Sequence, residues 1–594
     1  MRKKDISNWG TGQDLNCLLF FAYLMDEITF SYTIDSYKAP TLNVKSLCIE
    51  CLTVISDIKK DVINRGALNS VIEELVWAIE HDKIVSELIC NSQTALYIDE
   101  LLTNNTIDRI KNAVVLIFNS VCKMYTDKIK ERLTELIVEN RRKEDIESIT
   151  KLFVTDLLNM GYTNEYIYHT NQQFFFSSDG FIKDVNIINE YWNNFNGEKQ
   201  KYKVVILGFT LFKELKTVIK PFDIKIENNF TFEASDSKVD KYIKKLAANK
   251  YYIIFDEITA IEPYHACNIA QQTIEQFSNL FSFYHHKTSL EWRKESIVID
   301  VENAKISIIS KPTSRTLCCK DLRPRKASSV LNNVIQNIDF EKKSMYRIMK
   351  SIDLHEAAIT SESIENQFVN LFTAFEVLIP KSVSSGKDRI VQISDILVPF
   401  LCLDYYHKII GYLTKSLIEW DEVLFKQILG EVSEGNGHKE KIAAFLCLKK
   451  YSDIRDTVYK KIVSEKYVLL QNRIYKLEKL FSSTENIISH LKVHEKRIKW
   501  HIDRIYRTRN LIVHAGNTPQ YIDSLIENLH SYYDIMVKAI FEDNIKFKLN
   551  SLEHSYLTNE LKYKEYKKVL NEYSHIELTE ENFLKIIFNK FLPK

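Results

Sequence analysis

Glycine and proline are scarce in this chain, with 13 glycines and 9 prolines among 594 residues. Glycine provides the left-handed backbone that tight turns need, and proline interrupts helices. A chain with little of either favours long helices and has little material for the glycine-rich loops that bind nucleotide phosphates. We therefore expect a multidomain, mainly α-helical protein, and its length corresponds to about two to four domains.

The composition is that of a folded protein without a dominant charge. Hydrophobic residues make up 45% and charged residues 27%, and the net charge is only +1. The total charge therefore does not draw the chain to nucleic acid or membrane, and any RNA contact must come from a local basic patch. Ten scattered cysteines fit reduced thiols better than a disulfide framework.

The N-terminus is a poor match to a secretion signal or a membrane anchor. A polar stretch separates its first basic residues from an apolar run at 17–25, and Asp26 and Glu27 follow that run at once. The run is far too short to cross a bilayer. We therefore expect a cytoplasmic protein with no membrane partner.

Hydrophobic periodicity divides the chain into four regions. Residues 1–160 repeat apolar residues at helical spacing and are expected to form an N-terminal helical region. Residues 161–325 are expected to form a mixed α/β module with a sensor or regulatory role. Its signals are an amphipathic helix at 266–283 and four strand-like runs. The runs are 202–207, 251–255, 296–301 and 305–309, the last two forming a hairpin.

Helical periodicity returns after a basic, proline-bearing linker. Residues 340–545 are expected to form an α-helical bundle, and residues 546–594 a C-terminal helical extension. Within the bundle, one helix has a clear start and stop. Its start is the capping-box sequence 482–485, and Gly516 is its stop. Thr518 and Pro519 then predict the cap and first turn of the next helix.

The end of that helix carries the most chemistry in the chain, in the sequence 507–516, Arg-Thr-Arg-Asn-Leu-Ile-Val-His-Ala-Gly. Arginine neutralises a phosphate, and histidine transfers protons near neutral pH. Asn510 and His514 are four residues apart and share a helix face. Arg509 lies roughly 7.5 Å along the axis from His514, a gap that a phosphate can bridge. This segment predicts a metal-independent RNA-cleaving site.

The approach to the motif is basic, with seven Lys or Arg residues against two acids in 492–509. We expect four of them to bind RNA phosphates. These are Arg497, Lys499, Arg504 and Arg507. Two plainer interpretations remain open, because long helices carry lysine and arginine as a solvated face, and a terminal histidine often only caps carbonyls.

The segment Arg509-Asn510-Leu511-Ile512-Val513-His514 resembles the Arg, polar, three residues, His signature of HEPN ribonucleases. Residues 506–516 are similar to the ApeA-like HEPN branch of bacterial antiphage proteins. Residues 371–378, with Glu376 in an aromatic setting, resemble the first helix of that branch. The resemblance covers about 340–545. It implies a HEPN-type helical bundle that forms a homodimer and pairs two such motifs in one cleft.

By this resemblance, the chain is a metal-independent endoribonuclease that acts by 2′-hydroxyl attack. Arg509 stabilises the phosphorane, His514 acts as general base or acid, and Asn510 orients the phosphate or the histidine. Glu376 is expected to pair with Arg509, with a structural ion pair elsewhere in the bundle as an equal alternative. Arg507 competes for the role of Arg509, since it shares a face with His514.

The resemblance also implies a role in antiphage defence by abortive infection. The partners would be RNA, with tRNA as one candidate, and a phage-derived trigger. Two alternatives stay open. One is a non-catalytic HEPN-like module that binds RNA or protein, and the other is a structural interaction protein.

Two weaker motifs are incomplete, so we expect neither a cofactor nor a metal. Residues 253–257 resemble a Walker B strand ending in Asp256 and Glu257, but no phosphate-binding loop precedes them. Cys48 and Cys51 have CxxC spacing, but no second pair of ligands completes a zinc site. We interpret the first as a core strand and the second as structural thiols.

Overall fold

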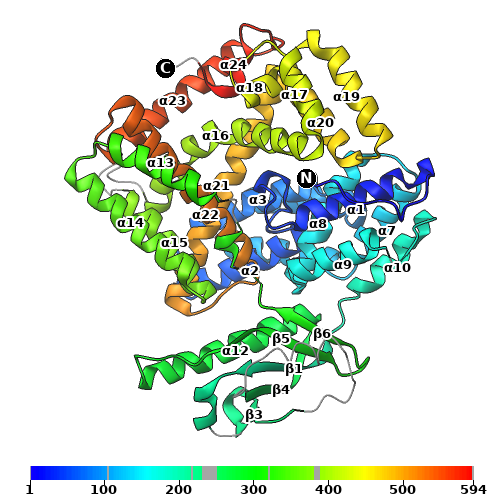
Figure 1. The fold of residues 1–594 in the computed structure, drawn as a ribbon, viewed down its shortest axis with the longest axis vertical. Coiled ribbons are helices and arrows are strands. Elements are labelled where there is room, and N and C mark those ends of the chain that lie inside the picture. The colour runs from blue at the N-terminus through cyan, green and yellow to red at the C-terminus, as the bar shows by residue number, and fades with distance from the viewer. Residues whose placement is uncertain are drawn as a thin grey trace. The chain divides into compact units, whose positions relative to one another are not determined.

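The computed structural model describes residues 2–103, 106–178, 180–215, 218–230, 251–312, 314–318, 321–379 and 388–590. The protein is mainly helical, with one small antiparallel sheet (Figure 1). It divides into two compact units. The helical unit contains residues 1–156, 178–186 and 314–594, and the sheet unit contains residues 157–177 and 187–313.

The helices of the helical unit come from both ends of the chain. From the N-terminal part they are α1 (Asn16–Thr29), α2 (Val44–Lys59), α3 (Ala67–His81), α4 (Val85–Leu88), α5 (Asn91–Thr103), α6 (Ile107–Val121), α7 (Tyr125–Val138) and α8 (Lys143–Met160), whose last turn belongs to the sheet unit. From the C-terminal part they are α13 (Pro324–Asn337), α14 (Lys342–Thr360), α15 (Ile364–Leu378), α16 (Arg389–Trp420), α17 (Glu422–Glu431), α18 (His438–Cys447), α19 (Ser452–Ser464), α20 (Val468–Leu480), α21 (Thr484–Ala515), α22 (Ile522–Phe547), α23 (Leu552–Glu572) and α24 (Phe583–Phe588).

The sequence suggested that residues 1–160 and 340–545 are separate domains, but the structure joins them. Helix α1 is buried along its length, from Cys17 to Thr29. A helix that is apolar on every side must be covered on every side, and α20 from the C-terminal part packs against it. Helix α3 likewise packs against α21. The two helical regions therefore share one core.

A buried ion-pair network ties these regions together. Arg473 of α20 contacts Glu27 of α1 at 2.6 Å and Glu147 of α8 at 2.9 Å, and all three side chains are at most 7% exposed. Lys476 also contacts Glu147, at 2.8 Å. Burial alone would raise the pKa of Glu147, but Arg473 and the nearby lysines hold it well below its usual range.

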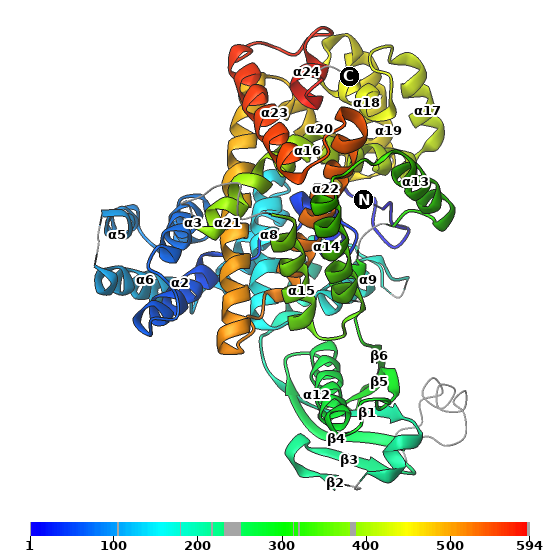
Figure 2. The same ribbon diagram turned by 90° about the vertical axis from the view of Figure 1, so that its left-hand side faces the viewer.

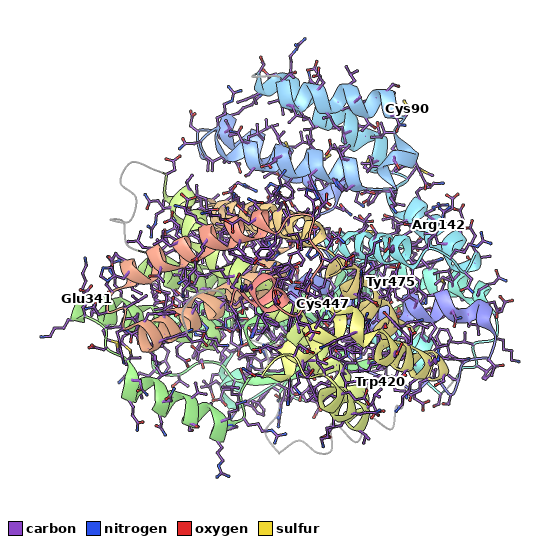
Figure 3. All side chains as sticks on the ribbon, turned by 90° about the horizontal axis from the view of Figure 1, so that it is seen from above. Cys90, Arg142, Glu341, Trp420, Cys447 and Tyr475 are labelled. Atoms are coloured by element: carbon purple, nitrogen blue, oxygen red, sulfur yellow. The ribbon has the colours of Figure 1, made fainter. Side chains whose placement is uncertain are left out.

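Helix α16 is, in the described part of the chain, the one helix long and apolar enough to cross a membrane. Within its most apolar window, 67% of the residues are buried inside the protein. It packs against α21, α22 and α23, and its Tyr406 hydroxyl donates to the Ile487 carbonyl at 2.7 Å. These contacts are those of a core helix. Its end at Trp420 is labelled in Figure 3, where the Trp420 indole donates to Glu465 at 2.9 Å.

The sheet unit contains a six-stranded antiparallel sheet in the order β2-β3-β4-β1-β5-β6. Helix α12 packs on β1, β4, β5 and β6, with Ala266, Ala270 and Ile274 in the shared core. The elements are β1 (Gln200–Gly208), β2 (Val218–Ile219), β3 (Ile224–Glu227), β4 (Tyr251–Ala260), β5 (Trp292–Asp300), β6 (Ile306–Ser310), α9 (Asn164–Phe176), α10 (Ile188–Trp192) and α12 (Pro263–Tyr284).

The four predicted strands and the amphipathic helix are confirmed, including the β5–β6 hairpin. The short strands β2 and β3 were not predicted. Asp256 lies on β4 and pairs with Lys203 of β1 at 3.2 Å and with Lys225 of β3. Its ion pairs on the sheet fit a structural strand.

Replacing Arg473 tests whether the two helical regions depend on each other. Arg473→Met removes the positive charge that balances the buried carboxylates of Glu27 and Glu147. Breaking a buried ion pair in this way lowers the free energy of unfolding by about 3–5 kcal/mol. We expect a lower midpoint of thermal unfolding for the whole helical unit. A matched substitution of the exposed pair, Lys426→Met, should change the midpoint little, because exposed ion pairs contribute about 0–1 kcal/mol. An Arg473→Met protein that melts like the wild type would contradict the shared core.

Candidate active site

Helix α21 carries the motif and begins and ends in the predicted segments, but its cap is Ser483 and not Ser482, the first residue of the capping-box sequence. The Ser483 hydroxyl accepts the Asn486 backbone N–H, and Gly516 ends the helix in the left-handed conformation at φ 63°. Leu491, Ile498 and Ile505 recur every seven residues along the helix, and all three are buried in the core. Figure 2 shows α21 between the N-terminal helices α2 and α3 and the C-terminal helix α15. The motif therefore sits at the end of a rigid, packed helix.

The start of the next helix differs from the prediction. Helix α22 begins at Ile522, and Thr518 does not cap it. The Thr518 hydroxyl instead donates to Glu365 at 3.1 Å, which ties the turn to α15. The predicted cap was a local signal, and the carboxylate of a neighbouring helix competes with it for the hydroxyl.

Two of the four residues predicted to bind RNA are already bound inside the protein. Arg504 is fully buried and contacts Glu50 at 2.9 Å and Glu74 at 2.5 Å. Arg507 is 11% exposed and contacts Glu50 at 3.1 Å and Ser70 at 2.9 Å. Neither guanidinium can reach an RNA phosphate in this conformation. They are structural residues that fasten α21 to α2 and α3.

The electrostatics of this buried cluster are asymmetric. Burial raises the pKa of a carboxyl, but the charges of Arg504 and Arg507 outweigh burial at Glu50 and lower its pKa to about 2. At Glu74 burial prevails, and the pKa is raised although Arg504 opposes the shift. Glu50 is thus the ionised partner that both arginines need.

The other two predicted RNA-binding residues remain on the surface. The Arg497 guanidinium lies over the Trp77 ring at 5.1 Å, and the Lys499 ammonium contacts Glu495 at 3.0 Å. Lys496 of the same stripe also faces an acid, Glu73, at 3.7 Å. The basic approach that the sequence shows is therefore largely neutralised by acids from α2, α3 and α21 itself.

Arg509 differs from its two neighbours because it is partly accessible. Its side chain is 27% exposed, and its Nη2 lies 3.9 Å from Glu376 of α15. Its Nη1 donates to the Asn510 side-chain oxygen at 3.1 Å. The expected Glu376–Arg509 pair is present, and Asn510 orients Arg509.

A second arginine, which the sequence did not single out, completes this group. Arg389 at the start of α16 lies 4.0 Å from Glu376. Its guanidinium also donates to the carbonyls of Glu376 and Ile379, at 2.9 and 2.8 Å, and so caps the end of α15. Glu376 thus sits between two guanidiniums. No local pattern marks Arg389, because its partners belong to a different helix.

His514 is the exposed member of the motif. It lies in the last turn of α21, and its side chain makes no hydrogen bond to any residue that the structure describes. Val513 beside it is also exposed, at 47%. The helix therefore ends in an unengaged imidazole next to an exposed apolar side chain.

The arrangement can hold an anion and transfer a proton. Arg509 offers a partly exposed guanidinium, and Glu376 and Asn510 fix its direction. His514, five positions later on the same helix, offers an imidazole to solvent. Among the described residues, neither Glu376 nor His514 belongs to a group of three side chains placed to hold a metal ion.

Comparison of the chain with protein-family profiles, with curated proteins and with solved structures found no match.

The two carboxylates that hold Arg504 provide a pH test of this scaffold. The depressed pKa of Glu50 stabilises the fold above the unfolded-state pKa near 4.5, and this stabilisation is lost as the pH falls toward 2. Glu50→Gln should therefore cost about 3–5 kcal/mol at pH 7, and its deficit should shrink below about pH 5. Unfolding midpoints measured from pH 7 down to about pH 2 give this profile.

Glu74→Gln is the matched control, since Glu74 also contacts Arg504 but has a raised pKa. A raised pKa means that the ionised carboxylate is less favourable in the folded protein than in the unfolded chain. Glu74→Gln should therefore lower the free energy of unfolding at pH 7 by less than Glu50→Gln does. Its deficit should not shrink in acid. Equal pH profiles for the two variants would contradict the assignment of Glu50 as the principal counter-ion.

Proposed function

We propose that this protein is a metal-independent endoribonuclease whose active site contains Arg509, Asn510, His514 and Glu376. The observation that carries the proposal is the contrast along α21. Arg504 and Arg507 form ion pairs with buried carboxylates, whereas Arg509 and His514 remain accessible at the end of the helix. This contrast also favours Arg509 over Arg507 as the phosphate-binding arginine. The resemblance to HEPN ribonucleases points to the same residues.

The proposed reaction is an internal transesterification of RNA. A general base takes the proton from a 2′-hydroxyl, and the oxygen attacks the adjacent phosphorus. The bond from phosphorus to the 5′-oxygen of the next nucleotide breaks, and a general acid protonates that leaving oxygen. The products are a 2′,3′-cyclic phosphate and a 5′-hydroxyl. Histidine suits both proton transfers near neutral pH.

In this mechanism Arg509 neutralises the charge that develops on the phosphorane. Its contacts to Glu376 and Asn510 hold the guanidinium in place before RNA arrives, which removes an ordering cost at the moment of reaction. Arg389 helps by capping α15 and holding Glu376. Glu376 and Arg389 are positioning residues, since they act through Arg509.

We propose that the active unit is a homodimer. In an in-line displacement the attacking 2′-oxygen and the leaving 5′-oxygen lie on opposite sides of the phosphorus, so one imidazole does not reach both, whereas two copies bring two His514 side chains. Val513 gives the end of α21 an apolar surface next to the motif, where a second copy can pack.

The biological role that fits is antiphage defence by abortive infection, with RNA, including tRNA, as the substrate class. A phage-derived trigger would release the activity, and the sheet unit is large enough to sense it. One observation favours the alternative of a non-catalytic RNA- or protein-binding module. Arg509 already has a carboxylate and an amide as partners, so phosphate must compete with Glu376 for it.

Single substitutions in the motif test the chemistry. Arg509→Ala and His514→Ala should each slow RNA cleavage in EDTA by about 100-fold or more, the loss typical of an oxyanion-stabilising or proton-transferring group. The substrates are total RNA and tRNA, separated on a denaturing gel. His514 is exposed and Arg509 is partly exposed, so circular dichroism should show an unchanged fold.

Two exposed residues away from the motif serve as matched controls, His554 on α23 and Arg325 on α13. Their alanine variants should cleave like the wild type. Motif variants that retain wild-type rates would disprove the site. RNA binding without cleavage, with and without lysate of phage-infected cells, would establish the non-catalytic module instead.

The dimer makes a separate prediction. Val513→Glu places a charge on the apolar end of α21 and should convert a dimer, measured by multi-angle light scattering, to a monomer. The same variant should lose cleavage although Arg509 and His514 are intact. Leu557→Glu, at an exposed leucine on α23, is the matched control and should stay dimeric and active. A wild-type monomer that cleaves RNA would contradict the paired site.

A further inference from the structure

Two histidines and a carboxylate converge between α14 and α22, apart from the motif residues. The Nε2 atoms of His355 and His530 lie 2.9 Å apart. The Asp534 Oδ1 atom, one turn after His530 on α22, lies 3.9 Å from each of them. All three atoms are close enough to bind one ion.

The size of this triangle is informative. The three separations place a point about 2.1 Å from each atom in their common plane. Zinc binds imidazole nitrogen at about 2.0–2.1 Å and carboxylate oxygen at about 2.0–2.2 Å. The donor set has the right chemistry for this ion, and one point lies at metal–ligand distance from all three atoms. Calcium and magnesium prefer sets of oxygen ligands and fit less well.

The helices are aligned so that these residues meet. The Asp339 backbone N–H, just before α14, donates to the Asn544 side chain of α22 at 2.9 Å. The backbone N–H of Glu341, a residue labelled in Figure 3, donates to the Asn550 carbonyl at 2.8 Å. The start of α14 therefore lies at the end of α22. About four turns along each helix from this junction, His355 faces His530.

The surroundings hold the histidines in position. The Tyr533 ring stacks on His355 at 4.6 Å, and the hydroxyls of Tyr533 and Ser351 are hydrogen-bonded at 2.9 Å. Such outer contacts set the orientation of metal-binding imidazoles. Burial lowers the pKa of both His355 and His530, which favours the neutral imidazoles that a metal requires.

The cluster is open on one side for a fourth ligand. His530 is buried, but the Asp534 side chain is 51% exposed. A water molecule can therefore complete a four-coordinate site on this side.

We propose that His355, His530 and Asp534 bind a divalent transition-metal ion of the zinc class that ties α14 to α22. Helix α15 packs against both helices, and its Phe375 contacts Tyr533 at 5.6 Å. The ion would therefore stabilise the part of the bundle that presents Glu376, the next residue of α15. The sequence predicted no metal, because the histidines are 175 residues apart and no ligand spacing connects them.

Metal binding to the full-length protein tests this proposal directly. After treatment with chelator and its removal, the wild type should take up one Zn²⁺ per chain, measured by titration calorimetry and by elemental analysis after gel filtration. Co²⁺ in place of Zn²⁺ should give the visible absorption of a low-coordinate nitrogen and oxygen site. Zn²⁺ should also raise the unfolding midpoint, since it binds only the folded state.

His530→Gln should weaken Zn²⁺ binding by about 100-fold or more, beyond the 10–100-fold typical of an outer-shell change. Asp534→Asn should weaken it too and, at an exposed position, should leave the fold intact in chelator. The double variant His285→Gln/His286→Gln changes an exposed histidine pair of the sheet unit and should bind Zn²⁺ like the wild type.

No saturable binding by the wild type would overturn the proposal, and the two imidazoles would then be a neutral hydrogen-bonded pair. Undiminished binding in both His530→Gln and Asp534→Asn would overturn it as well. So would loss of binding in the His285/His286 control. None of these results depends on ribonuclease activity, which the Arg509 and His514 variants test in EDTA.

Discussion

The rest of the structure depends on the buried pairing of Arg504 with Glu50 and Glu74. A fully buried guanidinium is stable only when carboxylates compensate it, and these come from α2 and α3, more than 400 residues earlier in the chain. Because Glu50 also binds Arg507, one carboxylate holds two consecutive turns of α21. The pairing fixes how α21 lies in the bundle, and therefore which of its residues reach solvent.

That constraint separates scaffold from site on a single helix. Arg504 and Arg507 face α2 and α3, whereas Arg509 is turned toward α15 and meets Glu376 there. Beyond Arg509 the helix has only two more turns, and His514 and Val513 emerge at its end. A second buried network, in which Arg473 pairs with Glu27 and Glu147, fixes α20 against α1 and α8. The N-terminal helices are thus part of the support for the proposed site.

The features that could be predicted from sequence are those with local causes. The start of α21 in the segment 482–485 and its stop at Gly516 are encoded next to the helix itself, and both are present, with Ser483 as the observed cap. The strands and α12 of the sheet unit were equally visible as alternating or amphipathic runs. The Glu376–Arg509 pair needed the resemblance as well, since the two residues are on separate helices.

The features that could not be predicted depend on partners far along the chain. The basic stripe of 492–509 looked like an RNA-binding surface because its acidic partners, such as Glu50 and Glu74, are not in the stripe. Thr518 looked like a cap until Glu365 became its partner. The His355–His530 cluster has no local signature for the same reason. Charge patterns predict surfaces poorly when buried counter-ions come from another part of the chain.

The most direct test of the proposed function is the chemistry of the RNA ends that the purified wild-type protein produces in excess EDTA. The mechanism with Arg509 and His514 predicts fragments with 2′,3′-cyclic phosphate and 5′-hydroxyl ends. These ends should be absent when His514→Ala replaces the wild type. The opposite result would be no cleavage in EDTA, with fragments that carry 5′-phosphate and 3′-hydroxyl ends once a divalent metal is added. It would contradict the mechanism, because those ends require water activated by the metal rather than an internal 2′-hydroxyl.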